Sequence, residues 1–182
     1  MKLLFIADPL QSFKIYKDTT FAMMREAQRR GHTLTVCEPQ HITWQRGSKV
    51  TARVQDIRLT GDATHWYEAQ PQRSAALADF DAVLMRKDPP FDNEFVYSTY
   101  LLEQAEQAGV LVVNRPQSLR DCNEKLFATQ FPQCTPKTLV SRRADILREF
   151  AREHRDIILK PLDGMGGSSI FRHREGDPNL SV

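Results

Sequence analysis

The chain has 182 residues, of which 41% are hydrophobic and 26% are charged, and its formal net charge is +2. This composition is ordinary for a soluble globular protein, and the length allows one large domain or two small ones. The small net charge, with basic residues spread along the chain, argues against a nucleic-acid-binding face. The cysteines Cys37, Cys122 and Cys134 form no C-x-x-C pair, so we expect neither a disulfide framework nor a zinc site, and a reduced, cytoplasmic location.

The first third of the chain begins with a strand–helix–strand pattern. Lys2–Ala7 is an apolar run, too short for a signal peptide, that predicts a buried strand. Asp18 can cap a helix over Thr19–Arg30, and Thr33–Cys37 alternates as a second strand. This order favours a parallel sheet with a right-handed crossover. No run in the sequence is long enough to span a membrane.

The next segments are more varied. His41–Leu59 has the alternation of a β-hairpin with an extension. Ala63–Ala78 is polar and contains Pro71, and we expect it to form a loop with a short helix. Ala82–Met85 is fully apolar and predicts another buried strand.

Two cations, Arg86 and Lys87, directly follow the predicted strand Ala82–Met85. Ligands of open α/β sheets bind beyond the carboxyl ends of the strands, and the two prolines that follow would stiffen the turn and hold a bidentate arginine. Arg86 is therefore a candidate ligand-binding residue. The alternative is that Arg86 only pairs with the nearby Asp88 or Asp92.

Asn93 or Asp92 can cap a predicted helix that runs through Ala108, and a buried strand is predicted from Val110 to Val113. Together with the earlier elements they predict a doubly wound α/β sheet. We expect this first domain to cover residues 1–121 and a second domain to cover residues 122–182.

The second domain is predicted from weaker patterns. We expect helical turns near residues 123–125, a strand over Lys137–Val140 and an amphipathic helix over Arg143–His154. These few elements would leave one face of a sheet without a cover, so we expect the domain to be incomplete or to be covered from elsewhere.

A glycine-rich stretch follows the helix and predicts strand, loop and strand from Asp156 to Phe171. Glycines at 164, 166 and 167 allow backbone N–H groups to approach anionic phosphate oxygens closely, and Lys160 would add a cationic donor. The stretch matches neither the P-loop nor the Rossmann fingerprint. The alternative is an ordinary hairpin with a glycine-rich turn and a surface lysine.

Three segments carry a resemblance to a known family: LMRKDPPFD at 84–92, NRPQSLRDCNEKL at 114–126 and IILKPLDGMGG at 157–167. With them the chain resembles the bacterial glutathione synthetases, which are ATP-grasp ligases. The similarity covers the whole chain but only the first part of the family's usual length. It implies an N-terminal, Rossmann-like substrate-binding lobe followed by the first, incomplete portion of an ATP-grasp α+β domain.

The resemblance also implies an activity, the ATP- and Mg²⁺-dependent ligation of γ-glutamylcysteine and glycine. The carboxylate is first phosphorylated, the amine of glycine attacks the acyl phosphate, and glutathione, ADP and phosphate result. Such chemistry needs cations over the transferred phosphoryl group and a shielded intermediate.

By position, the resemblance implies that two lysines contact the ATP phosphates and that the glycine turn forms a small lid over them. The implied ATP-binding residues are Lys125, Lys160, Gly164, Met165, Gly166 and Gly167.

On the substrate side, the resemblance implies that Arg86 binds a peptide carboxylate. Lys17 and Asp18 are candidates for the same cleft, although they could equally be charges at a helix start that interact with its dipole.

No catalytic residue is assignable, because the magnesium ligands and phosphate-clamping arginines of the family are expected beyond Val182. We therefore expect this chain alone not to perform the full reaction. We also expect a homo-oligomer, with no nucleic-acid or membrane partner. Two alternatives stay open: an ATP-grasp ligase for another acid, and a non-catalytic nucleotide-binding or subunit module.

Overall fold

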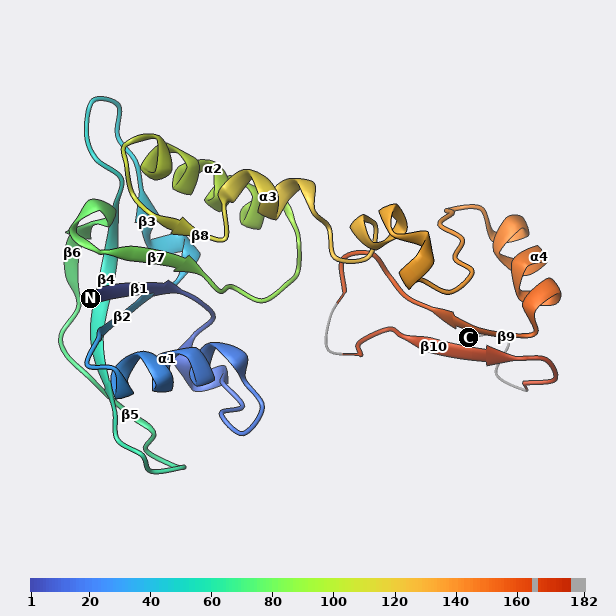
Figure 1. Ribbon diagram of the computed structural model, residues 1–182, viewed down its shortest axis with the longest axis horizontal. Coiled ribbons are helices and arrows are strands. Elements are labelled where there is room, and N and C mark those ends of the chain that lie inside the picture. The colour runs from blue at the N-terminus through green and yellow to red at the C-terminus, as the bar shows by residue number, and fades with distance from the viewer. Residues whose placement is uncertain (165–166, 178–182) are drawn as a thin grey trace. The chain divides into compact units, whose positions relative to one another are not determined.

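The computed structural model describes residues 1–164 and 167–177, and it consists of two compact units (Figure 1). The first unit contains Met1–Asp88 and Asp92–Asp121. The second contains Pro89–Phe91 and Cys122–Val182.

The first unit is a mixed α/β fold around one sheet. Its strands are β1 (Lys2–Ile6), β2 (Thr33–Cys37), β3 (Ile42–Thr43), β4 (Thr51–Leu59), β5 (Tyr67–Ala69), β6 (Arg73–Ala76), β7 (Ala82–Met85) and β8 (Val112–Val113). Its α-helices are α1 (Thr19–Arg29), α2 (Asn93–Gln107) and α3 (Pro116–Asp121), and short 3₁₀ helices cover Leu10–Ser12, Pro39–His41 and Leu77–Asp79.

The sheet has the order β3-β4-β2-β1-β7-β8, with β5 and β6 also paired to β4. The four strands β2, β1, β7 and β8 are parallel, whereas β4 runs antiparallel to β2 and carries the remaining strands. The predicted strand–helix–strand opening is thus confirmed, and so is the hairpin, which β3 and β4 form.

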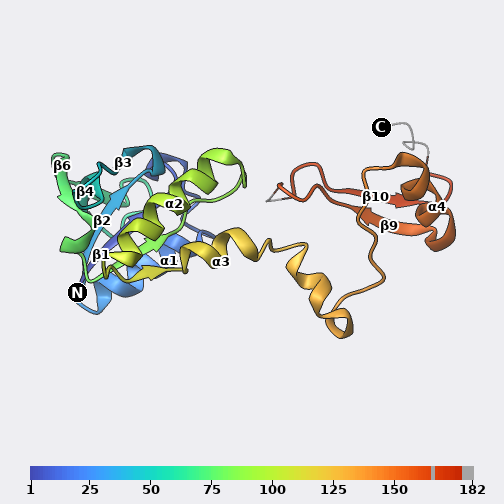
Figure 2. The same ribbon diagram turned by 90° about the horizontal axis from the view of Figure 1, so that it is seen from above.

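Helices cover both faces of this sheet, with α2 on one face and α1 on the other (Figure 1), and Figure 2 looks down on the α2 side. This confirms the doubly wound expectation. Successive side chains of β1 point to opposite faces because a strand has a period of two. Leu4 and Ile6 pack in a core cluster with Leu102 of α2. Phe5 packs in a second cluster with Met24 of α1.

The helix starts follow the predicted capping. The Asp18 carboxylate accepts a hydrogen bond from Phe21 N at 2.8 Å at the start of α1, and Asp92 accepts one from Phe95 N at 2.9 Å at the start of α2. Such caps satisfy backbone N–H groups that have no partner within the helix. Both helices therefore begin where the sequence predicts.

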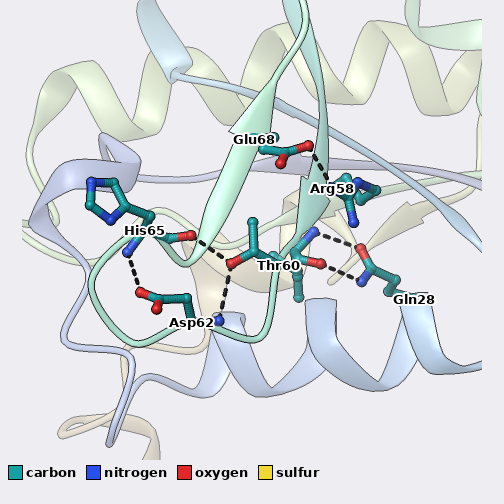
Figure 3. A network of polar contacts seen from close by, with 7 residues as sticks. Gln28, Arg58, Thr60, Asp62, His65 and Glu68 are labelled. Carbon is teal, nitrogen blue, oxygen red and sulfur yellow. Dashed lines mark hydrogen bonds and ion pairs between the residues drawn. The ribbon is translucent and has the colours of Figure 1, made fainter.

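A side-chain amide fixes α1 to the end of β4 (Figure 3). Gln28 donates from Nε2 to Leu59 O at 2.9 Å and accepts from Leu59 N at 2.7 Å. The loop that follows β4 is closed by its own polar side chains, since Thr60 Oγ1 donates to His65 O and Asp62 accepts from His65 N.

The expectation for Ala63–Ala78 is partly wrong. The segment forms β5 and β6, which both pair with β4, and only its end forms the 3₁₀ helix Leu77–Asp79. Long-range pairing with the nine-residue strand β4 overrides the weak local pattern. The predicted strand Val110–Val113 is also shorter, with only Val112–Val113 in the sheet.

The second unit contains helix α4 (Ala144–His154) and an antiparallel pair, β9 (Asp156–Leu159) and β10 (Phe171–Arg174). Two 3₁₀ helices, Phe127–Gln130 and Pro132–Cys134, precede them. The predicted strand–loop–strand of the glycine-rich stretch is thereby confirmed for its two strands.

Apolar side chains of the second unit are unevenly covered. Ile157 is buried, whereas Ile158 and its near neighbour Phe171 on β10 are 50% and 53% exposed. The predicted strand Lys137–Val140 is wrong, because these residues are in neither a strand nor a helix. A strand needs a pairing partner, and none of the described strands pairs with this segment.

We expect Met24→Ala to lower the free energy of unfolding of the first unit by about 2–5 kcal/mol, because it leaves a cavity beneath α1. Met24 is fully buried, whereas its neighbour Met23 is 39% exposed. Urea unfolding monitored by Trp66 fluorescence measures the change. Met23→Ala is the matched control, and a similar loss in both variants would contradict the packing of α1.

A second prediction concerns Asp56, whose carboxylate ties β4 to β2 and β6. It accepts from Thr35 Oγ1 at 2.6 Å and pairs with Arg73 at 3.0 Å, and the Arg73 hydrogen bond holds the pKa of Asp56 below its usual value. A lowered folded-state pKa contributes stability above the unfolded pKa, which is lost as the pH falls through the folded value. The free energy of unfolding should therefore fall less steeply below about pH 4 in Asp56→Asn than in the parent chain. The free energy of unfolding is measured by urea unfolding at several pH values. The same dependence on pH in both proteins would contradict this prediction.

Candidate functional site

The first unit has a hollow at the carboxyl ends of β1 and β7. β1 lies between two parallel neighbours, with α1 returning the chain to β2 on one side, so the strand order reverses here. Crevices at such switch points are the usual ligand sites of open α/β sheets. The hollow is lined by Asp8, Ser12, Phe13, Asp18, Thr20, Arg86 and Asp88.

Arg86 is placed in this hollow by strand pairing. Its backbone N donates to Ile6 O at 2.7 Å, which continues the pairing of β7 with β1. Its guanidinium donates from Nε to Thr20 Oγ1 at 3.2 Å and from one terminal nitrogen to Thr19 Oγ1 at 3.0 Å. The alternative that Arg86 pairs with Asp88 or Asp92 is not seen in the described part of the chain, where its recorded partners are these hydroxyls.

Lys87, the other cation after β7, is already paired. Its ammonium lies 2.8 Å from Asp8 Oδ1, and Asp8 Oδ2 accepts from Asp88 N at 2.8 Å. Partial burial, followed by the charges of Asp8 and Asp18, raises the pKa of the Asp88 carboxyl above its usual value. Arg86 is thus the cation of this lining, and it shares the hollow with the carboxylates of Asp8, Asp18 and Asp88 without a direct ion pair to any of them in the described part of the chain.

The other substrate-side candidates differ from each other. Asp18 lines the hollow, and its carboxylate also caps α1 through Phe21 N. Lys17 is exposed, and its ammonium lies 6.0 Å from the centre of the Tyr16 ring, outside the lining of the hollow.

Sequence reasoning missed Asp8, Thr19 and Thr20. Asp8 follows β1 as Arg86 follows β7, so the same strand-end argument could have found it. The threonines carry no such signal, because only the pairing of β1 with β7 brings Arg86 to the first turn of α1.

In the second unit, Lys125 lies against the turn that follows β9. Its ammonium donates to Leu162 O at 3.2 Å and to Gly164 O at 2.5 Å, and Glu124 lies 3.4 Å away. The lysine follows a turn in which Asn123 Oδ1 accepts from Lys125 N. Lys125 is therefore brought to the glycine-rich turn, although Leu162 and Gly164 follow it by 37 and 39 positions in the sequence.

Lys160 comes directly after β9, at the start of the same turn, and its side chain is exposed. Gly164 makes a close approach, because a Cβ there would lie 2.9 Å from Pro161 Cγ. Gly167 has a φ of +83°, a conformation that favours glycine. The predicted site residues Met165 and Gly166 lie outside the described residues.

Within residues 1–164 and 167–177, we find no group of three or more histidine, cysteine, aspartate or glutamate side chains arranged to hold a metal ion. The described helices are each too short or too polar to cross a membrane.

Two family models match consecutive parts of the chain. Residues 1–120 match the family described as prokaryotic glutathione synthetase, N-terminal domain. Residues 124–182 match the family described as prokaryotic glutathione synthetase, ATP-grasp domain.

Individual relatives are similar to nearly the whole of this chain. The chain is 63% identical to the glutathione synthetase of Pseudomonas aeruginosa over 177 residues, which are 97% of this chain and 56% of that protein. It is 53% identical to the glutathione synthetase of Vibrio cholerae over 182 residues, all of this chain and 57% of that protein. The chain thus spans a little over half the length of these relatives.

A solved structure shares the fold. The ATP-grasp ligase PsnB, in complex with a phosphomimetic variant of a minimal precursor, Mg and ADP, matches with a TM-score of 0.50 at 16% identity, over 93% of this chain and 56% of PsnB. The two family matches, which together take in both compact units, show that this chain belongs to the prokaryotic glutathione synthetase family.

Proposed function

We propose that the protein containing this sequence is a glutathione synthetase, in which these residues supply a substrate-binding lobe and the first part of the ATP-grasp domain. It would join γ-glutamylcysteine and glycine through an acyl phosphate, with release of ADP and phosphate. The observation that carries the proposal is the match of the two consecutive segments to the two domains of this family.

The glycine-rich turn supports nucleotide binding in the second unit. The ammonium of Lys125 carries three N–H donors, and it is held at the turn by carbonyl oxygens, which are neutral acceptors. Phosphate oxygens are stronger acceptors for an ammonium because they are charged. Lys125 and Lys160 would therefore hold ATP through its phosphates, with backbone N–H groups of the turn from Gly164 to Gly167 as further donors.

When bound, ATP and Mg²⁺ would activate a carboxylate by converting it to an acyl phosphate. The chain's own part is to bind and orient the reactants. No magnesium ligand is assigned to the described residues.

The hollow of the first unit supports binding of an acidic peptide. Arg86 offers a guanidinium whose hydrogen-bond partners are hydroxyls, and an arginine can hold a carboxylate in a planar, two-point geometry. Asp18 and Asp88 on the same lining could attract an amino group of the peptide. Lys17 would add only long-range attraction.

A different acid substrate is the second candidate, because the same fold occurs in PsnB, an ATP-grasp ligase that was solved in complex with a variant of a minimal precursor. The family match favours γ-glutamylcysteine over such a substrate. We further propose a cytoplasmic homo-oligomer without nucleic-acid or membrane partners, in keeping with the near-neutral charge.

The activity is tested with the purified full-length protein. We expect ADP release that requires both γ-glutamylcysteine and glycine, together with the appearance of glutathione. ADP release with another acidic peptide, and none with γ-glutamylcysteine, would favour the second candidate and contradict the first.

Nucleotide binding is tested with Lys125→Ala. We expect the dissociation constant for ATP to rise at least about tenfold, because a hydrogen-bonded cation is removed from the phosphate site. Isothermal titration calorimetry measures this constant. Lys137→Ala, which removes an exposed lysine of the same unit, is the matched control.

Lys160→Ala provides a separate test, because Lys160 has an exposed side chain and its removal should cost little stability. We expect weaker ATP binding with an unchanged melting temperature. An ATP dissociation constant equal to that of the parent protein would remove Lys160 from the site.

A further inference from the structure

Arg86 is held by neutral groups. Its Nε donates to Thr20 Oγ1 and a terminal nitrogen donates to Thr19 Oγ1, at 3.2 and 3.0 Å. A hydroxyl fixes the direction of a guanidinium by hydrogen bonding but does not cancel its charge. The contacts therefore orient Arg86 without a direct ion pair, while the carboxylates of Asp18 and Asp88 lie in the same hollow.

Arg120, in the same unit, shows the contrasting arrangement. It also donates to a threonine, Thr99 Oγ1, at 3.1 Å, but it pairs with Glu103 at 2.7 Å as well. That arginine is neutralised and lies outside the lining of the hollow. Arg120 is thus paired directly with a carboxylate, whereas Arg86 is bonded directly to hydroxyls and interacts with Asp88 only through space.

The location of Arg86 adds to its positive potential. Thr19 and Thr20 are the first two residues of α1, where the helix dipole presents its positive end. A cation gains nothing from this end of a helix, whereas an anion bound to the cation does. The Asp18 carboxylate already lies at this end through its bond from Phe21 N, and a carboxylate bound to Arg86 would interact favourably with the same positive end.

Thr20 is suited to fix a neighbour. It is 3% exposed, and the cap formed by Asp18 fixes the start of its helix. A buried acceptor on a fixed helix start restricts the orientation of its partner before the ligand arrives. Such pre-organisation lowers the entropy lost on binding.

We propose that Thr20, assisted by Thr19, is a positioning residue that orients the Arg86 guanidinium toward a carboxylate of the acidic peptide substrate. The inference rests on the proposed function, in which Arg86 binds that carboxylate. It assigns to the threonines no direct contact with the reacting atoms.

The competing explanation is that these hydrogen bonds only fasten α1 to the end of β7. Removing the Thr20 hydroxyl would then lower stability without changing recognition of one substrate. Kinetics with each substrate in turn separate the two explanations, since a structural defect has no reason to single out the peptide.

The experiment measures KM for γ-glutamylcysteine, glycine and ATP in the full-length protein carrying Thr20→Val, which keeps the side-chain shape but removes the hydroxyl. We expect KM for γ-glutamylcysteine to rise about tenfold, the effect of losing one hydrogen bond to a charged group. KM for ATP and glycine should change less than about twofold. Thr20→Ser, which restores the hydroxyl, should recover most of the loss.

Thr99→Val is the matched control, because it removes a buried hydroxyl that bonds an arginine outside the hollow. It should lower the melting temperature and leave all three KM values unchanged. Thr19→Val tests the second contact at an exposed position, so it remains informative if Thr20→Val does not fold.

A double-mutant cycle with Arg86→Met tests whether the threonine acts through the arginine. In that background Thr20→Val should raise KM for γ-glutamylcysteine no further. A further rise of the same size as in the parent protein would overturn the proposal, and so would an unchanged peptide KM in both Thr20→Val and Thr19→Val. A parent protein that turns over other peptides but not γ-glutamylcysteine contradicts the proposed substrate, and the threonines are then judged on the peptide that it uses.

Discussion

The first unit depends on the parallel pairing of β1 with β2 on one side and β7 on the other. Because both neighbours run in the same direction as β1, their carboxyl ends meet at one edge of the sheet. The backbone bond from Arg86 N to Ile6 O extends this pairing by one residue beyond β7. Side chains that are nearly eighty positions apart in the sequence therefore share one hollow.

The two adjacent cations that follow β7 have different electrostatic environments. Lys87 is neutralised by Asp8, which also accepts from the backbone of Asp88 and so closes the turn. Arg86 is oriented by the hydroxyls of Thr19 and Thr20. Lys87 thus stabilises the fold of the loop, whereas Arg86 makes no direct ion pair with a carboxylate in the described part of the chain. Two neighbouring residues of like charge can have different roles when their partners differ in charge.

The second unit uses a lysine to connect distant parts of its chain. The ammonium of Lys125 donates to the carbonyl oxygens of Leu162 and Gly164, which belong to the turn between β9 and β10. The carbonyl oxygens satisfy N–H donors of this ammonium without neutralising its charge. Its pairing with Glu124 is weak, because the two groups are 3.4 Å apart and the Glu124 side chain is 69% exposed. This environment is compatible with exchange of the carbonyls for charged phosphate oxygens.

Much of this architecture is determined by the sequence itself. Apolar runs such as Lys2–Ile6 and capping residues such as Asp18 and Asp92 act locally, so they specify strands and helix starts without knowledge of the rest of the fold. The position of Arg86 directly after a buried strand was also readable, because strand ends are where α/β sheets bind ligands. Family-specific segments supplied the candidate lysines, which no local rule distinguishes from surface charges.

Only the tertiary structure decided the remaining features. β5 and β6 form because β4 offers them long-range partners, whereas Lys137–Val140 has no pairing partner among the described strands. The threonine acceptors of Arg86 become visible only when β7 is placed beside β1. Local sequence encodes the propensity of a segment, whereas pairing and charge compensation depend on which distant groups the fold brings within hydrogen-bonding distance.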